Sequence, residues 1–236
     1  MLKEIINKFY ADQSRDREQI HFYITDAGKC PRAIFFKFKK APKKEMDPRI
    51  LRLFDHGNYL HQLIMKALFA ADKLHVVASE VNMPPQEMIS GRADAILSLD
   101  NELYILDIKS MNSMIFRNLT APKEENVNQV QLYLHYFKIK TAILLYVDKD
   151  QLELKEFFIE YDPELCNRLL DGFKILQKKI ELDTVPLVLN DYPNNWQCNY
   201  CQFREICNLT GRGEINWRQF KEKIKGETEK VLQQNL

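Results

Sequence analysis

The chain has few of the residues that interrupt regular structure. Its 236 residues include only 7 glycines and 9 prolines, with 45% hydrophobic and 28% charged residues, a composition that excludes collagen-like and low-complexity classes. No apolar run approaches the ~20 residues that cross a bilayer. The start, MLKEIINKFYADQ, mixes charges into apolar positions like an amphipathic helix, unlike a signal peptide. We therefore expect a globular cytoplasmic protein with no membrane association.

The chain also lacks a strong net charge and a nucleotide-binding loop. The formal charge is +1, so a site for a polyanion must be a local patch. The segment KFKKAPKK, Lys37 to Lys44, is either such a patch or a solvated loop. No G-x4-G-K-[ST] motif is present, which excludes an ATP-driven helicase.

Hydrophobic periodicity predicts an α/β protein. Helices are expected over about 25–38, 47–74, 121–138 and 162–182 and from about Trp217, and strands over about 75–83, 88–98, 103–111, 141–148 and 152–160. This order favours a central mixed β-sheet flanked by helices. We predict three segments: an N-terminal helical segment 1–46, a core 47–185, and a cysteine-containing segment with a tail helix 186–236. The first and last would form a second layer.

Charged residues interrupt the apolar hairpin GRADAILSLDNELYILDIKS. Pairing of its strands around Asp100-Asn101 places Asp94 opposite Asp107, and Lys109 projects on the same side as Asp107. Two carboxylates this close repel each other unless a cation lies between them. Mg²⁺ and Mn²⁺ are hard ions that take oxygen ligands. The alternative is a solvated strand face with an Asp–Lys pair.

Three further residues favour the metal-site interpretation. Gly91 would let the backbone approach a ligand closely, Glu80 offers a third carboxylate on the preceding strand, and His61 offers an imidazole on the long helix. A helical histidine taken alone is more often an ordinary core or surface residue.

These residues together resemble the PD-(D/E)XK nucleases, and more narrowly their RecB-like branch. The motifs are Gly57-x3-His61, Gly91-x2-Asp94, Asp107-Ile108-Lys109 and Gln129-x3-Tyr133, with Ala93 where the name-giving proline would stand. The resemblance implies a restriction-endonuclease-like core. It also implies that His61, Asp94, Asp107 and the carbonyl of Ile108 hold the metal.

The same resemblance assigns roles to the remaining site residues. Lys109 would activate water and stabilise charge, and Gln129 and Tyr133 would lie at the edge of the site near the DNA. Gln131 with His135 is a competing register for the last motif. Arg32, Phe35, Phe36 and Tyr133 are candidates for guiding a DNA strand, with core packing as the alternative for the aromatic residues.

Three of the five cysteines are clustered, as Cys198-x2-Cys201-x5-Cys207. Four thiolates bind either zinc or an iron–sulfur cluster, and the fourth is either Cys30 or Cys166. The spacing resembles the iron–sulfur RecB-like nucleases, which include the CRISPR-associated Cas-four nucleases and AddB-type subunits. This resemblance implies a [4Fe–4S] cluster on Cys30, Cys198, Cys201 and Cys207, in an iron–sulfur layer made by both ends of the chain.

The expected function is metal-dependent hydrolysis of DNA phosphodiester bonds. The resemblance implies an exonuclease that acts on single-stranded DNA or DNA ends, in CRISPR adaptation, phage or viral recombination, or DNA repair. An additional endonuclease activity is left open. Expected partners are DNA, CRISPR integration proteins or recombination proteins, and further copies of the chain in a homo-oligomer. The alternatives are a non-catalytic DNA-binding module and a zinc-stapled scaffold that retain the fold.

Overall fold

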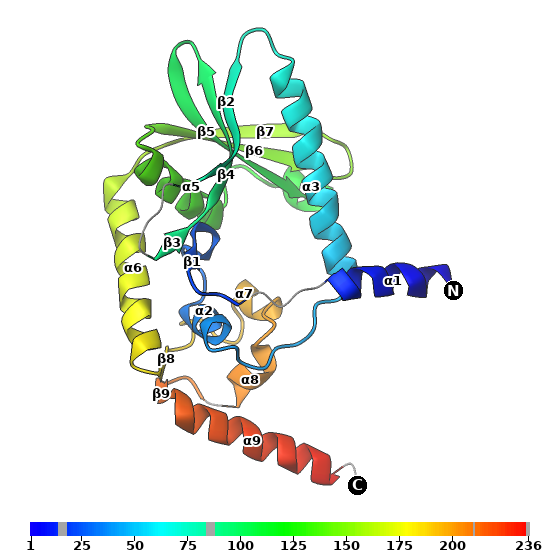
Figure 1. Ribbon diagram of the computed structural model, residues 1–236, viewed down its shortest axis with the longest axis vertical. Helices are drawn as coiled ribbons and strands as arrows, with labels where there is room; N and C mark the ends of the chain where they lie inside the picture. Colours follow the sequence, from blue (N-terminus) through cyan, green and yellow to red (C-terminus); the bar gives the residue numbers. More distant parts are fainter. Residues whose placement is uncertain (14–17, 84–87, 210, 235–236) are drawn as a thin grey trace. The chain divides into compact units, whose positions relative to one another are not determined.

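The computed structural model describes residues 1–13, 18–83, 88–209 and 211–234, with side chains to residue 225 (Figure 1). Its helices are α1 (Leu2–Gln13), η1 (Ile24–Asp26), α2 (Pro31–Phe38), α3 (Pro48–Phe69), α4 (Ser113–Arg117), α5 (Glu124–Phe137), α6 (Pro163–Glu181), α7 (Trp196–Asn199), α8 (Arg204–Asn208) and α9 (Trp217–Gln234). Its strands are β1 (Phe22–Tyr23), β2 (His75–Asn82), β3 (Ile89–Ser90), β4 (Arg92–Leu99), β5 (Glu102–Met111), β6 (Thr141–Asp148), β7 (Leu154–Glu160), β8 (Thr184–Val185) and β9 (Ile215–Asn216).

The prediction of a mixed central sheet with flanking helices is confirmed. Five strands lie in the order β2-β4-β5-β6-β7; β5 and β6 run parallel, and the other neighbours are antiparallel. Helix α5 connects the two parallel strands, as a crossover between parallel strands requires. The β4–β5 turn is the predicted one: Asp100 and Asn101 both have positive φ, as a two-residue hairpin loop of type I′ needs.

Alternation along the strands directs successive side chains to opposite faces of the sheet, and both faces carry buried apolar residues. Leu106 and Ile108 of β5 join Ala95 of β4 and Leu60 of α3 in a buried hydrophobic cluster. Asp107, between them, therefore projects toward the other face, where α5 lies against β5 and β6. The candidate site thus lies on the face of the sheet that α5 covers, where Ile105 of the same strand is also buried.

Some predicted elements have different limits. The helix expected over 25–38 is instead η1 followed by α2. Pro31 has no N–H to donate, so it cannot lie inside a helix that begins at residue 25, but it is favoured at the first position of α2. The strand expected over 88–98 is divided at Gly91 into β3 and β4, and β3 pairs with β1. The short helices α4, α7 and α8 and the short strands β1, β8 and β9 were not predicted.

Two compact units contain the described residues. One comprises Met1–Gln13, His21–Ala27 and Pro48–Leu169 and holds the central sheet; the other comprises residues 18–20, Gly28–Asp47 and the chain from Leu170 onward. The predicted division at residues 46 and 185 remains a proposal, since the units group the chain differently around α1 and α6. Among the described helices, none is long and apolar enough to cross a membrane.

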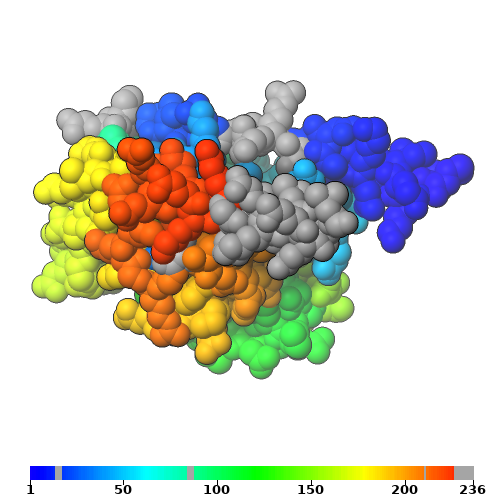
Figure 2. Space-filling view, turned by 90° about the horizontal axis from the view of Figure 1, so that it is seen from below, coloured from blue at the N-terminus to red at the C-terminus, as the bar shows by residue number. Residues whose placement is uncertain are grey.

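The N-terminal helix α1 is exposed. No residue of α1 is buried, and Figure 2 shows this helix (dark blue) at the surface.

Two lysines of the Lys37–Lys44 segment pair with carboxylates in the second unit: Lys39 with Asp183, and Lys40 with Glu18 at 2.8 Å. The positive charge of this segment is therefore partly compensated within the protein.

Candidate active site

The β4–β5 hairpin brings the two predicted acids together. Its ladder pairs Leu97 with Tyr104, Ile96 with Ile105 and Ala95 with Leu106, so the next step in this register is Asp94 with Asp107. Asp94 Oδ2 accepts a hydrogen bond of 2.6 Å from the backbone N–H of Ile108. The structure therefore has the predicted strand register, and the acids lie where the ladder of paired residues ends.

Asp107 is a buried carboxylate with a cation beside it. It is 2% exposed; Gln129 Nε2 donates to its Oδ1 at 3.0 Å, and Lys109 Nζ lies 2.7 Å from its Oδ2. Burial raises the pKa of Asp107 to about 6 and nearby Asp94 raises it as well, while Lys109 opposes both. The Lys109 ammonium is close enough for an ion pair but not directed as a hydrogen bond, so within the described residues Asp107 Oδ2 has no hydrogen-bond partner.

His61 reaches this group from α3. Its Nδ1 lies 3.4 Å from Asp94 Oδ1. Burial lowers the pKa of His61, but contact with Asp94 outweighs it and leaves the pKa raised. Gly57, one helical turn earlier, permits the approach of α3, because a Cβ there would lie 3.3 Å from Ser110 Oγ of β5.

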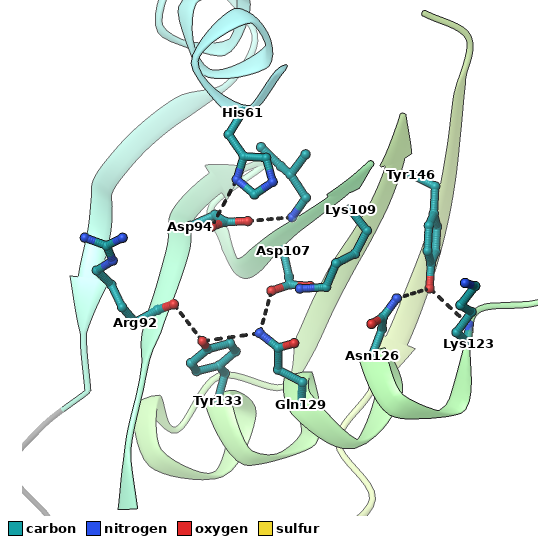
Figure 3. Close-up of polar contacts among 11 residues, drawn as sticks. His61, Arg92, Asp94, Asp107, Lys109, Lys123, Asn126, Gln129, Tyr133 and Tyr146 are labelled. Carbon is teal, nitrogen blue, oxygen red and sulfur yellow. Dashed lines mark hydrogen bonds and ion pairs between the residues drawn. The ribbon is translucent and has the colours of Figure 1, made fainter. Parts of the chain in front are cut away.

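Helix α5 presents Gln129 and Tyr133 to the site, as Figure 3 shows. Tyr133 Oη accepts from Gln129 Nε2 at 3.4 Å and donates to the carbonyl of Arg92 at 2.6 Å. Burial raises the pKa of Tyr133, so the phenol keeps its proton. The competing pair is directed elsewhere: Gln131 contacts the Glu160 carbonyl and the Asp162 N–H, and His135 contacts Tyr161. Spacing alone did not separate these two registers.

Three expected features have different surroundings in the structure. Glu80 lies opposite Asp94 in the β2–β4 ladder, but its carboxylate pairs with Arg92 at 2.7 Å. Ile108 contacts Asp94 through its N–H, whereas the prediction concerned its carbonyl. Gly91 does not leave room for a ligand: a Cβ there would lie 2.8 Å from Ile24 Cδ1, so the space is filled by protein. Arg92 was not singled out from the sequence, although GRAD places it beside Asp94.

The oxygen and nitrogen atoms of the candidate site are of the kinds that bind a divalent cation. Two carboxylates and an imidazole meet here, and the buried Asp107 Oδ2 has a lone pair that no hydrogen bond uses. As the side chains stand, no three His, Cys, Asp or Glu residues in the described ranges are gathered closely enough to hold a metal ion.

The four cysteines expected to bind a cluster belong to the second unit. None of the four thiols forms a disulfide bond, and each pair of them interacts electrostatically: Cys30 with Cys198 and Cys207, Cys201 with Cys30 and Cys207, and Cys198 with Cys201 and Cys207. Burial raises the pKa of Cys30, Cys198 and Cys201. Cys166 is fully buried in the other unit and lies outside this set.

Residues suggested as DNA guides have structural roles in the second unit. Arg32 is 1% exposed, and it donates to the carbonyls of Pro186 (2.6 Å), Gly211 (3.0 Å) and Gly213 (2.7 Å) and to Cys207 Sγ (3.7 Å). Phe35 and Phe36 are buried against Trp217 and Phe220. Core packing, the alternative named for these aromatic residues, is what the structure shows.

Comparisons with known proteins show the superfamily to which the chain belongs. The CRISPR-associated exonuclease Cas4 of Saccharolobus solfataricus is 28% identical over 201 residues, covering 82% of this chain and 90% of that protein. The crystal structure of SSO0001 superposes with a TM-score of 0.58 at 25% identity, covering 88% of this chain and 96% of that one. The fold is also similar to the alkaline exonuclease LHK-Exo of Laribacter hongkongensis, with a TM-score of 0.52 at 11% identity and coverage of 74% and 92%. Residues 61–208 match the PD-(D/E)XK nuclease superfamily, and the chain belongs to this superfamily.

Proposed function

We propose that this nuclease hydrolyses DNA phosphodiester bonds with Mg²⁺ or Mn²⁺, acting as an exonuclease on single-stranded DNA or DNA ends. The observation that carries the proposal is the meeting of Asp94, Asp107 and Lys109, with Gln129 holding Asp107. The names of two similar proteins include the word exonuclease, which supports this choice over an endonuclease.

The residues of the site have separable tasks in this reaction. Asp94, Asp107 and His61 would hold the divalent ion, which when bound acts as a Lewis acid and lowers the pKa of water. Lys109, whose Nζ lies 2.7 Å from Asp107 Oδ2, places a positive charge where negative charge develops on the phosphate. Gln129 fixes Asp107, and Tyr133 fixes the main chain of β4 at Arg92.

We further propose a [4Fe–4S] cluster on Cys30, Cys198, Cys201 and Cys207. Its support is that these four cysteines belong to one compact unit, come from segments far apart in the sequence and form no disulfide bond. Four thiolates are the ligands that such a cluster uses. The cluster would join α2 to the segment after α6. Stoichiometric iron and sulfide in the purified protein would support it, whereas stoichiometric zinc without iron would contradict it.

CRISPR adaptation is the pathway that the comparisons favour, because the Saccharolobus relative is called CRISPR-associated. DNA and CRISPR integration proteins would then be the partners. Recombination and repair are the alternatives, and the similar fold of an alkaline exonuclease is compatible with them.

The nuclease proposal is tested by incubating labelled single-stranded and double-stranded oligonucleotides with the protein in Mg²⁺, Mn²⁺ or EDTA. We expect cleavage that needs the metal and progresses from an end. Asp107→Ala and Lys109→Ala should abolish it while circular dichroism shows an unchanged fold. Full activity of either variant would contradict the proposal. Tight DNA binding without cleavage by the wild type would favour the non-catalytic alternative.

A further inference from the structure

An exposed ion pair lies next to the candidate active site. Arg92 Nη1 is 2.7 Å from Glu80 Oε2, and the two side chains are 62% and 56% exposed. In the β2–β4 ladder Val81 faces Ala93 and Ser79 faces Ala95, so Glu80 lies opposite Asp94 and diagonal to Arg92. A DNA strand bound at Asp94 would therefore meet these two charged side chains directly.

The main chain of Arg92 is fixed to the acidic group while its guanidinium stays exposed. Arg92 precedes Asp94 by two residues in β4, so both side chains project from the same face. Its carbonyl accepts the 2.6 Å hydrogen bond from Tyr133, which is linked through Gln129 to Asp107 (Figure 3). The position of Arg92 relative to the two acids is thus set by buried contacts.

Glu80 has an unusual backbone conformation for a residue inside a strand. Its φ is +52°, in the left-handed region, which is strained for a residue other than glycine. The alternation of β2 breaks at this point, and Ser79 and Glu80 are both exposed. Non-glycine residues held in this region cluster at functional sites. The exposure of the Glu80 carboxylate follows from this local conformation.

The energetics allow Arg92 to exchange partners. Exposed ion pairs contribute little to stability, so Arg92 separates readily from Glu80. A phosphodiester offers a bidentate partner for the guanidinium, and its neutralisation releases counterions. The interaction of Arg92 with a nucleic-acid phosphate is therefore more favourable than its interaction with Glu80.

We propose that Arg92 binds a backbone phosphate of the DNA strand next to the phosphate at the acidic site, and that Glu80 competes with DNA for Arg92. The inference rests on the proposed nuclease function and adds a binding residue and an internal competitor to it. It also gives Glu80 a different role from the metal ligand expected from the sequence.

The test compares Arg92→Gln and Glu80→Gln with Lys140→Gln, which also removes one positive charge. Lys140 precedes β6, at the end where Thr141 pairs with Tyr104, whereas Asp107 pairs with Leu144 further along. Binding of a fluorescent single-stranded oligonucleotide is measured by anisotropy in EDTA over a range of NaCl concentrations. Thermal unfolding checks that each variant is folded. If Arg92→Gln does not fold, Arg92→Lys replaces it in the comparison.

The two substitutions should act in opposite directions. Arg92→Gln should raise Kd about 5- to 20-fold and reduce the slope of log K against log [NaCl] by about 0.7, the value for one phosphate of a single strand. Arg92→Lys should keep the slope with an intermediate Kd, since it keeps the charge but not the bidentate geometry. Glu80→Gln should lower Kd below that of the wild type, and Lys140→Gln should change Kd less than about two-fold.

Two results would overturn the inference. One is an Arg92→Gln variant that binds like Lys140→Gln. The other is a Glu80→Gln variant that binds DNA no better than the wild type, or that needs far more Mn²⁺ for cleavage, which would assign Glu80 to the metal. If the wild type binds as expected but does not cleave in Mn²⁺, the nuclease proposal fails and the role of Arg92 in binding stands.

Discussion

At the scale of single residues, the site depends on how Asp107 is held. Its carboxylate is buried, which raises its pKa to about 6, so its ionised form is less favoured than that of an ordinary Asp side chain. Gln129 and Lys109 each contact one of its oxygens. A divalent ion bound beside Asp107 would stabilise the ionised form that burial disfavours.

Gln129→Ala tests the support of Asp107. The substitution removes the donor to Asp107 Oδ1, and loss of such a supporting contact typically costs about 10- to 100-fold in metal affinity or activity. The Mn²⁺ concentration for half-maximal cleavage should rise by that factor. Gln131→Ala is the matched control on the same helix, since its amide contacts Glu160 and Asp162 instead. An equal effect of both substitutions would show that the helix matters only for stability.

At the scale of elements, the β4–β5 hairpin was the most predictable feature. A two-residue turn fixes which residues face each other, so Asp100-Asn101 determined the partner of Asp94 from sequence alone. The surroundings of Gly91 and Glu80 were not predictable in this way. They depend on the packing of Ile24 after β1 pairs with β3, and on one left-handed residue in β2.

Helix α5 shows the same limit of local patterns. Gln129-x3-Tyr133 and Gln131-x3-His135 have identical spacing, and only packing against the sheet decides which pair faces Asp107. Likewise, the choice between Cys30 and Cys166 as the fourth ligand could not be made from spacing, because it depends on which segments fold into the same unit. Motif order and turn geometry were readable from the sequence, whereas long-range packing was not.

Gly91→Ala tests the contact between β4 and η1. The added Cβ would lie 2.8 Å from Ile24 Cδ1 and 2.9 Å from its Cγ1, and Ile24 is fully buried. Such overpacking should reduce the free energy of unfolding by about 1–3 kcal/mol, measured in urea. Adding Ile24→Val should recover part of the loss. Gly172→Ala in α6 meets nothing within 4 Å and should stabilise by about 0.5–1 kcal/mol. Equal effects at both glycines would contradict the packing argument.

Ser113→Ala tests a second buried carboxylate, at the end of β6. Burial tends to raise the pKa of Asp148, but hydrogen bonds from the Asp150 N–H and from Ser113 Oγ, 2.7 Å from Oδ1, outweigh it and lower the pKa. A lowered pKa means that these contacts stabilise the fold above the ordinary Asp pKa and lose that effect as the pH falls toward the lowered value.

The loss caused by Ser113→Ala should therefore depend on pH. Removing this donor should lower the free energy of unfolding at neutral pH, where Asp148 is ionised. The difference from the wild type should shrink as the pH approaches the acidic range. Urea unfolding over a pH series measures it, and a difference that is constant or larger in acid would contradict the assignment of the effect to Asp148.

At the scale of the whole molecule, the residues of the two proposed sites belong to different units. Asp94, Asp107 and Lys109 belong to the unit with the central sheet, and the four cysteines proposed to bind the cluster belong to the other. Loss of the cluster should therefore affect the second unit first. This separation makes the metal of the nuclease site and the proposed cluster independently testable.

Cys30→Ser should remove iron and the visible absorption of the proposed cluster, because three thiolates then remain. We expect a lower unfolding temperature and faster proteolysis after α6. Cys166→Ser is the control: this cysteine is buried in the first unit, and its replacement should leave the iron content unchanged. Full iron content in Cys30→Ser together with loss in Cys166→Ser would identify Cys166 as the fourth ligand instead.

The most direct measurement for the whole account is Mn²⁺ binding, followed by electron paramagnetic resonance, in the wild type and in Asp107→Asn. The substitution keeps the shape of the side chain and removes its charge. We expect the wild type to bind Mn²⁺ and cleave DNA, and Asp107→Asn to lose about 100-fold or more in both. Wild-type Mn²⁺ affinity and cleavage in Asp107→Asn would contradict the assignment of this group as the catalytic metal site.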